Sequence, residues 1–152
     1  MCKINSLINL YYILNNNFNN NDFKKLISIV NLYDGSDWKY FSIINKNKNY
    51  NKVFIPLISN NIEMYIITWN KHIISKIHNH SKNGCILKLL KGELYENHYD
   101  HSLNLLSHNK INKNDTTYID NKLGYHSIIS KNELSVSLHI YSPPKHKTIY
   151  FN

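Results

Sequence analysis

The stretch HNHSKNGCILKLLKG, residues 78–92, carries the pattern that decides the fold. Two histidines separated by one residue precede a run rich in Ile and Leu, which favours a β-strand. Side chains along a strand alternate between its two faces, so His78 and His80 are predicted to point the same way. Two neutral imidazoles on one face can chelate a metal ion. Taken alone, such a pair in a chain with nine histidines is more often two surface residues.

Short runs rich in Ile, Leu, Tyr and Val extend from about Lys52 onward, separated by Asn, Gly, Asp and Lys. They are VFIPLI (53–58), MYIITW (64–69), ISKIHNH (74–80), CILKLL (85–90), ELYENHY (93–99), TTYI (116–119), HSIIS (126–130) and SVSLHIY (135–141). Evenly spaced strands predict a mainly β fold, a sandwich or a small barrel. Pro143 and Pro144 should end the last strand, because proline has no amide hydrogen to donate.

The first 36 residues follow a different, helical period. A first helix is predicted from Leu7, Leu10, Tyr11 and Leu14, and a second, after a cap at Asp22, from Phe23, Leu26, Ile27, Val30 and Leu32. The tract NNNFNNND (15–22) between them is polar and of low complexity, which predicts an exposed connection. Residues 1–36 are therefore expected to form a helical front portion of a single domain, 1–152.

Composition narrows the class of protein. The 152 residues suit one compact core, and the net charge of +8 comes from lysines scattered among asparagines, with no arginine in the chain. This pattern argues against a nucleic-acid partner. Two cysteines are too few for a disulfide framework, and no apolar run is long enough to span a bilayer. SLINLYYIL (6–14) is interpreted as the first helix and not as a signal peptide. A cytoplasmic protein without a membrane partner is expected.

Several of these motifs together resemble a known family. The segment 78–92 is similar to the first cupin motif, with Gly92 at its conserved glycine but Cys85 in place of the usual acidic ligand. That replacement, with SDWKYF (36–41), YNKVFI (50–55), LGYH (123–126) and above all SVSLHIYSPP (135–144), resembles the cysteine dioxygenases. The resemblance implies a cupin-type β-barrel or jelly roll with short N-terminal helices.

It also implies a metal centre and a reaction. His78, His80 and His126 match the family's three iron ligands, so Fe(2+) is the expected cofactor. Three neutral ligands leave the ion its full charge, which favours an anionic thiolate. The implied enzyme is an oxidoreductase that adds both atoms of O2 to L-cysteine, giving cysteine sulfinic acid. A monomer is expected.

Two further features of the family have counterparts here. Cys85 and Tyr141 match the pair that forms a thioether cross-link, although Cys85 alone would more often be an ordinary buried thiol. Ser137, His139 and Tyr141 fall at alternate positions of one strand and share a face, so hydroxyl, imidazole and phenol can hydrogen-bond in series. The resemblance implies that this relay orients Tyr141 in catalysis. The alternative is a polar face that is simply open to solvent.

Substrate binding is the part of the site that the sequence determines least. Tyr50 and Lys52 match the tyrosine and arginine around the family's substrate carboxylate, and lysine is a departure that makes this contact less directional. The resemblance implies that Tyr141 contacts the substrate as well. Lys52 can equally be a surface residue. The alternatives left open are another small thiol (3-mercaptopropionate, cysteamine or an N-terminal cysteine) and a cupin that binds a metal or ligand without turnover. KHKTIYFN (145–152) resembles the family's closing strand after the loss of a long loop.

Overall fold

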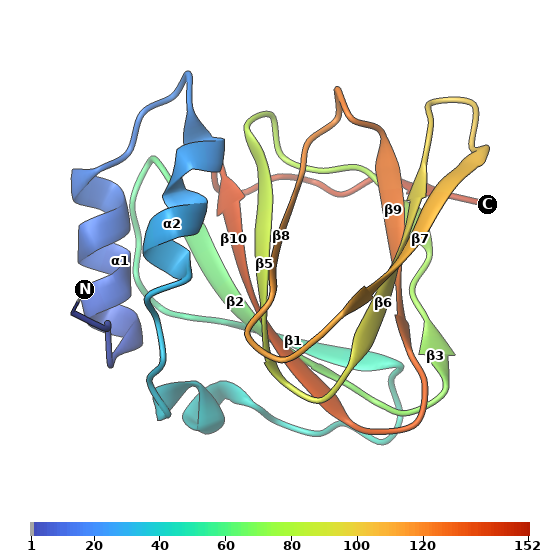
Figure 1. Ribbon diagram of the computed structural model, residues 1–152, viewed down its shortest axis with the longest axis horizontal. Helices are drawn as coiled ribbons and strands as arrows, with labels where there is room; N and C mark the ends of the chain where they lie inside the picture. The colour runs from blue at the N-terminus through green and yellow to red at the C-terminus, as the bar shows by residue number, and fades with distance from the viewer. Residues whose placement is uncertain (1) are drawn as a thin grey trace.

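The computed structural model describes residues 2–152 and shows two antiparallel sheets facing each other, with helices on the outside of one of them (Figure 1). The first sheet has the strand order β1-β2-β10-β5-β8, and the second the order β11-β4-β9-β6-β7 with β3 beside β9. The bounds in the first sheet are β1 Tyr50–Phe54, β2 Glu63–Trp69, β5 Gly84–Lys91, β8 Thr116–Ile119 and β10 Ser135–Ser142. Those in the second are β3 Ile73–Ile74, β4 Ile77–His78, β6 Leu94–Tyr99, β7 Leu105–Ile111, β9 Tyr125–Ser130 and β11 Tyr150–Phe151. This is the mainly β, jelly-roll architecture that the sequence predicts.

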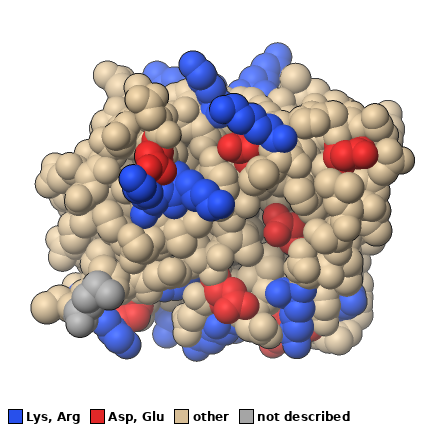
Figure 2. All heavy atoms as spheres, turned by 45° about the horizontal axis from the view of Figure 1, so that its top comes forward, with Lys and Arg blue, Asp and Glu red and all other residues tan. Residues whose placement is uncertain are grey.

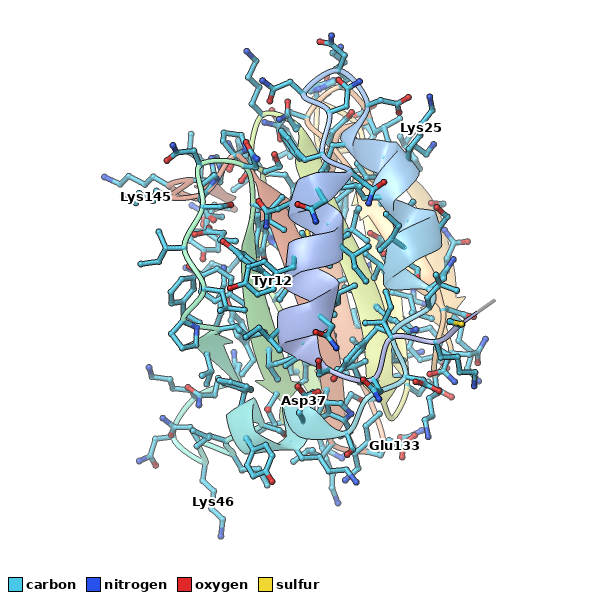
Figure 3. The ribbon with its side chains drawn as sticks, turned by 90° about the vertical axis from the view of Figure 1, so that its left-hand side faces the viewer. Tyr12, Lys25, Asp37, Lys46, Glu133 and Lys145 are labelled. Carbon is cyan, nitrogen blue, oxygen red and sulfur yellow. The ribbon has the colours of Figure 1, made fainter. Side chains whose placement is uncertain are left out.

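The helical front portion packs on the outer face of the first sheet. It consists of α1 Leu7–Asn16, the 3-10 turn η1 Phe23–Leu26 running directly into α2 Ile27–Val30, and a second 3-10 turn η2 Asp37–Phe41. The Ser6 hydroxyl caps α1 by accepting from the amide of Asn9. Figure 3 looks onto this side, with α1 crossing in front of the sheet and Tyr12 projecting away from it. Both predicted helices are present, although the second begins as a tighter turn.

The tract 15–22 is an exposed connection in part only. Asn15 and Asn16 complete α1, and the aromatic ring of Phe18 packs against the buried core between helices and sheet. Asp22 occupies the predicted cap position but makes no capping hydrogen bond, and its carboxylate pairs with Lys25 instead. The polar composition correctly predicted a loop, yet the one aromatic residue within it is used for packing.

Both faces of the first sheet are buried, so every side chain of β10 faces either the helices or the space between the sheets. Val136, Leu138 and Ile140 point outward into the apolar layer shared with the helices. Ser137 and His139 point inward, and their exposed fractions are 0% and 3%. The alternative of a solvent-exposed polar face on this strand is therefore wrong, because the helices cover the other side and leave only the interior for these groups.

Two strand predictions need correction, and one strand was missed. The run 53–58 leaves the sheet after Phe54, because Pro56 cannot continue a ladder. The run 74–80 splits into β3 and β4, and β4 ends at His78, so His80 lies outside any strand. The strand β7 was not predicted at all, since its residues LLSHNKI are mostly exposed and polar at an edge of the sheet.

The space between the sheets is divided along its length. One part is an apolar core that includes Ile67, Leu87, Leu94 and Ile128. The other part holds most of the molecule's buried histidines together with Tyr141. Within residues 2–152 no helix is long and apolar enough to cross a membrane.

Candidate metal centre

Three histidine side chains converge in the polar part of the interior. His78 ends β4, His126 lies opposite it on β9 as its register partner, and His80 reaches in from the loop after β4. The Nε2 atom of His126 is 2.9 Å from Nε2 of His80 and 3.1 Å from Nε2 of His78. Their potential ligand atoms all lie within 4.8 Å of one another. The structure thus brings the three predicted ligands together, although His80 does not share a strand with His78.

The protonation of these rings follows from what their second nitrogens face. The Nδ1 atom of His78 lies 2.8 Å from the carbonyl oxygen of Lys76, which can only accept, so Nδ1 carries the proton and Nε2 a lone pair. The Nδ1 atom of His126 lies 2.6 Å from Oε1 of Glu96, and a carboxylate there likewise accepts. Two lone pairs therefore face each other, an arrangement that a shared cation relieves.

Burial keeps all three rings neutral and able to donate a lone pair. Loss of solvation lowers the pKa of His78, and it holds the pKa values of His80 and His126 well below their usual range. Metal–imidazole bonds of about 2.1 Å at right angles place two ligand nitrogens about 3.0 Å apart. The two spacings from Nε2 of His126 agree with that value, and these neutral nitrogen donors are of the kind that binds a metal ion.

Glu96 is a functional candidate that sequence reasoning missed. It lies on β6 with its side chain pointing inward, 13% exposed, and its carboxylate pairs with His126. Burial raises the pKa of this carboxyl. Metal-bound histidines are commonly oriented by such a carboxylate on the far nitrogen. The alternation in ELYENHY could have placed Glu96 on the inner face, but its pairing with a residue 30 positions later is invisible in one sequence.

The predicted relay on β10 is present as a hydrogen-bonded chain. The indole Nε1 of Trp69 donates to the Ser137 hydroxyl over 2.8 Å, and that hydroxyl lies 2.8 Å from Nε2 of His139. The other ring nitrogen, Nδ1, is 3.3 Å from the Tyr141 hydroxyl. Because Trp69 can only donate, Ser137 is free to donate onward to His139, and Nδ1–H then faces the phenol oxygen. The sequence did not predict that Trp69 belongs to this relay.

Cys85 and Tyr141 are direct neighbours across two strands. They are register partners of β5 and β10, and the Cys85 thiol lies 3.8 Å from Nδ1 of His139. Burial raises the pKa of the Cys85 thiol to about 12 and that of the Tyr141 hydroxyl well above its usual range. Both groups are therefore protonated at neutral pH and lie beside each other within the same site.

Lys52 stands at the mouth of the site. Its side chain is exposed along β1, but the ammonium lies 4.2 Å from the ring centre of Tyr65 and 4.4 Å from that of Tyr141. Partial loss of solvation lowers its pKa, and no carboxylate among the described residues pairs with it directly. The ring of Tyr50 packs against Trp69 at 4.8 Å. The three predicted substrate-binding residues, Tyr50, Lys52 and Tyr141, thus border the same opening.

A cavity of about 40 Å³ lies between these groups. Its lining includes Lys52, His78, His126, Tyr141 and Tyr150. One water molecule needs roughly 10–15 Å³ of such space, so the cavity suits about three waters. The lysines form no single charged patch on the surface shown in Figure 2, where they lie in separate groups with acidic residues between them.

Comparisons with known proteins place the chain in one family. The model of the family described as cysteine dioxygenase type I matches residues 1–152. Cysteine dioxygenase type 1 of Danio rerio is 30% identical over 117 residues, which are 71% of this chain and 58% of the relative. The protein of the same name from Homo sapiens is 29% identical over 119 residues, 73% of this chain and 59% of the relative. The chain thus spans about three fifths of these relatives' length.

Solved structures support the fold alone. An uncharacterised protein with a double-stranded β-helix domain from Klebsiella pneumoniae has a TM-score of 0.59 at 12% identity, covering 72% of this chain and 84% of that one. The DMSP lyase DddQ from Ruegeria pomeroyi also gives 0.59, at 13% identity, covering 72% of this chain and 56% of that one. Both share the jelly-roll layout of two facing sheets, which many different activities use.

Proposed function

The chain belongs to the cysteine dioxygenase type I family, and from that premise we propose that it is an iron-dependent dioxygenase that oxidises L-cysteine to cysteine sulfinic acid. The single observation that carries the proposal is the convergence of three neutral imidazoles beside a small cavity with a lysine ammonium at its mouth. We further propose that it works as a monomer in the cytoplasm. The net reaction is balanced, since one thiol and one O2 give one sulfinic acid.

His78, His80 and His126 would hold the ion. Ferrous iron bound by three neutral ligands would keep its charge, favour the thiolate form of the substrate and supply the positions at which thiolate and dioxygen meet. Glu96 would keep the Nδ1 proton on His126, so that Nε2 remains the donor.

Lys52 would orient the substrate through its carboxylate. The ammonium lies over two tyrosine rings, which hold it at the cavity mouth without neutralising its charge. A carboxylate bound there leaves a short thiol side chain pointing inward toward the three histidines. A cation at this place supports a free amino acid over a peptide with an N-terminal cysteine, because the first residue of a peptide has no free carboxylate.

Ser137, His139 and Trp69 would fix the Tyr141 hydroxyl in place. The indole N–H at one end gives the chain of hydrogen bonds a single direction, so the Tyr141 oxygen accepts a hydrogen bond from Nδ1–H of His139 and its own hydroxyl hydrogen is left to donate toward the substrate.

We propose that Cys85 and Tyr141 become joined by a thioether. The bond would form between Sγ and a ring carbon of Tyr141 as the S–H and ring C–H bonds break, and the two hydrogens with their electrons would pass to dioxygen, giving hydrogen peroxide. Their position as cross-strand neighbours supports it. Peptide mass spectrometry after turnover should find a joined peptide lighter by two hydrogens than its parts, and its persistent absence would contradict this step.

Oxygen uptake tests the function. Iron-loaded protein given L-cysteine should consume one O2 per sulfinic acid formed, and zinc-loaded protein should consume none. Parallel assays with cysteamine, 3-mercaptopropionate and a short peptide with N-terminal cysteine rank the substrates. Faster turnover of any of these would identify it as the preferred thiol, while no uptake with all four would leave a metal-binding cupin without turnover.

A further inference from the structure

His80 is placed differently from the other two histidines. His78 and His126 lie in strands, whereas β4 ends two residues before His80 and no ladder holds its backbone. The rings of His78 and His126 are also each fixed by a partner on Nδ1. The Nδ1 atom of His80 is buried and has no hydrogen-bond partner. Its ring direction therefore depends on where its backbone is held.

The Asn121 side chain holds that backbone by two hydrogen bonds. The amide N–H of His80 donates to Oδ1 of Asn121 over 2.8 Å, and Nδ2 of Asn121 donates to the His80 carbonyl oxygen over 2.8 Å. A side-chain amide that satisfies both backbone groups of one residue acts like one rung of a β-ladder. The two residues are 41 positions apart in the chain.

Asn121 is itself held in place. It lies in the turn between β8 and β9, where the Asp120 carboxylate accepts from the amide of Leu123 over 2.9 Å. Its own carbonyl oxygen lies 2.6 Å from Nε2 of His101. The turn also leads directly into β9, five residues before His126. The same short segment thus carries one histidine of the cluster and fixes the backbone of another.

We propose that Asn121 is a positioning residue of the metal site: its amide fixes the backbone of His80 and thereby aims the one imidazole that no other group orients. This inference rests on the proposed metal site. Groups that orient metal ligands typically change metal affinity by about ten- to a hundredfold when they are removed. Asn121→Ala and Asn121→Ser should both show a loss in that range.

Asn121→Ser is included because serine suits a turn and preserves folding, while its single short hydroxyl cannot span both backbone groups of His80. Asn132→Ala is the matched control, since Asn132 is an exposed asparagine in another turn. Cobalt(II) titration of the metal-free protein measures affinity, and amide hydrogen exchange of the metal-free protein measures protection at His80.

Weaker cobalt binding by roughly tenfold or more, with faster exchange at the His80 amide in both Asn121 variants but not in Asn132→Ala, is the expected result. Affinity within twofold of the unaltered protein, unchanged exchange at His80, or an equal loss in Asn132→Ala would overturn the proposal. If the unaltered protein and His126→Ala bind cobalt equally poorly, the proposed metal site fails, while the exchange result still judges the Asn121 contact separately.

Discussion

The two walls of the site are built by different means. On the β10 wall, Ser137, His139 and Tyr141 are spaced by the regular alternation of one eight-residue strand. On the opposite wall, the segment around His78 to His80 has strands of only two residues, and distant side chains supply the hydrogen bonds that a long ladder would give. A regular strand positions its groups through local sequence, whereas an irregular segment needs partners from elsewhere in the chain.

Asn79 shows the same principle as Asn121. Its amide N–H donates to the carbonyl oxygen of Ile149 over 3.1 Å, and its Oδ1 accepts from the amide of Ile149 over 2.8 Å. The closing segment of the chain is thereby tied to the loop between two of the three histidines. The metal-side wall is held from three directions, by β9, by the β8–β9 turn and by the C-terminal segment.

Removal of one ligand should give the largest effect on this wall. His126→Ala leaves two imidazoles and an unpaired Glu96 carboxylate, so metal affinity should fall by at least about a hundredfold and oxygen uptake should be lost. Metal analysis after dialysis checks this. His108→Ala, at an exposed histidine on β7, serves as control. Full metal content in His126→Ala would contradict the assignment.

The features that could be predicted from the sequence lie mainly on the β10 wall, and those that could not lie on the metal-side wall. The inner face of β10 and the Cys85 to Tyr141 pairing were accessible, because strand period and a specific motif coincide there. The prediction that His78 and His80 share a strand face was wrong, since the strand ends at His78. Glu96 and Asn121 escaped notice, because nothing local in the sequence reveals contacts across 30 and 41 residues.

Neutralising Glu96 should have the second largest effect. Glu96→Gln keeps an oxygen that can accept from His126 but removes the negative charge, and an amide can also turn its N–H toward the ring. Metal affinity should fall by about ten- to a hundredfold. Glu133→Gln on the exposed β9–β10 turn is the matched control. Isothermal titration with iron(II) under anaerobic conditions measures both, and equal affinities would show that the carboxylate does not tune His126.

Lys52 tests whether the substrate is held from the β1 side. Lys52→Ala should lower kcat/KM for L-cysteine by roughly tenfold, the effect of one charge-assisted hydrogen bond at a position that solvent partly screens. Cysteamine lacks the carboxylate and should lose almost nothing. Metal affinity should not change, which separates this effect from the other wall. Equal losses with both thiols would mean that Lys52 does not read the carboxylate.

The smallest expected effect is a change in pH dependence on the β10 wall. Burial, with the charge of Lys52 second, holds the pKa of His139 well below its usual range. In the unfolded chain the ring titrates near 6.5, so below that pH the unfolded protein binds more protons than the folded one. The contribution of His139 to stability is thus complete above about pH 6.5 and is lost as the pH falls toward its folded pKa. The slope is at most about 1.4 kcal/mol per pH unit.

His139→Gln should therefore flatten the fall in stability of the metal-free protein between about pH 6.5 and 5 by up to that slope. Ser137→Ala is the control, because it removes no titrating group: it leaves the Trp69 indole and one nitrogen of His139 unpartnered, costs about 1–3 kcal/mol at every pH and keeps the slope. Urea unfolding across this range measures both variants.

His126, on the other wall, is also neutral through burial, so His126→Ala should flatten the pH dependence of stability too. If the two histidines titrate independently, the changes in slope should add in the double variant. A His139→Gln curve parallel to that of the unaltered protein would mean that His139 takes up its proton in the folded state as it does in the unfolded chain. A protonated ring donates from both nitrogens, so Ser137 could then not donate to Nε2 as proposed.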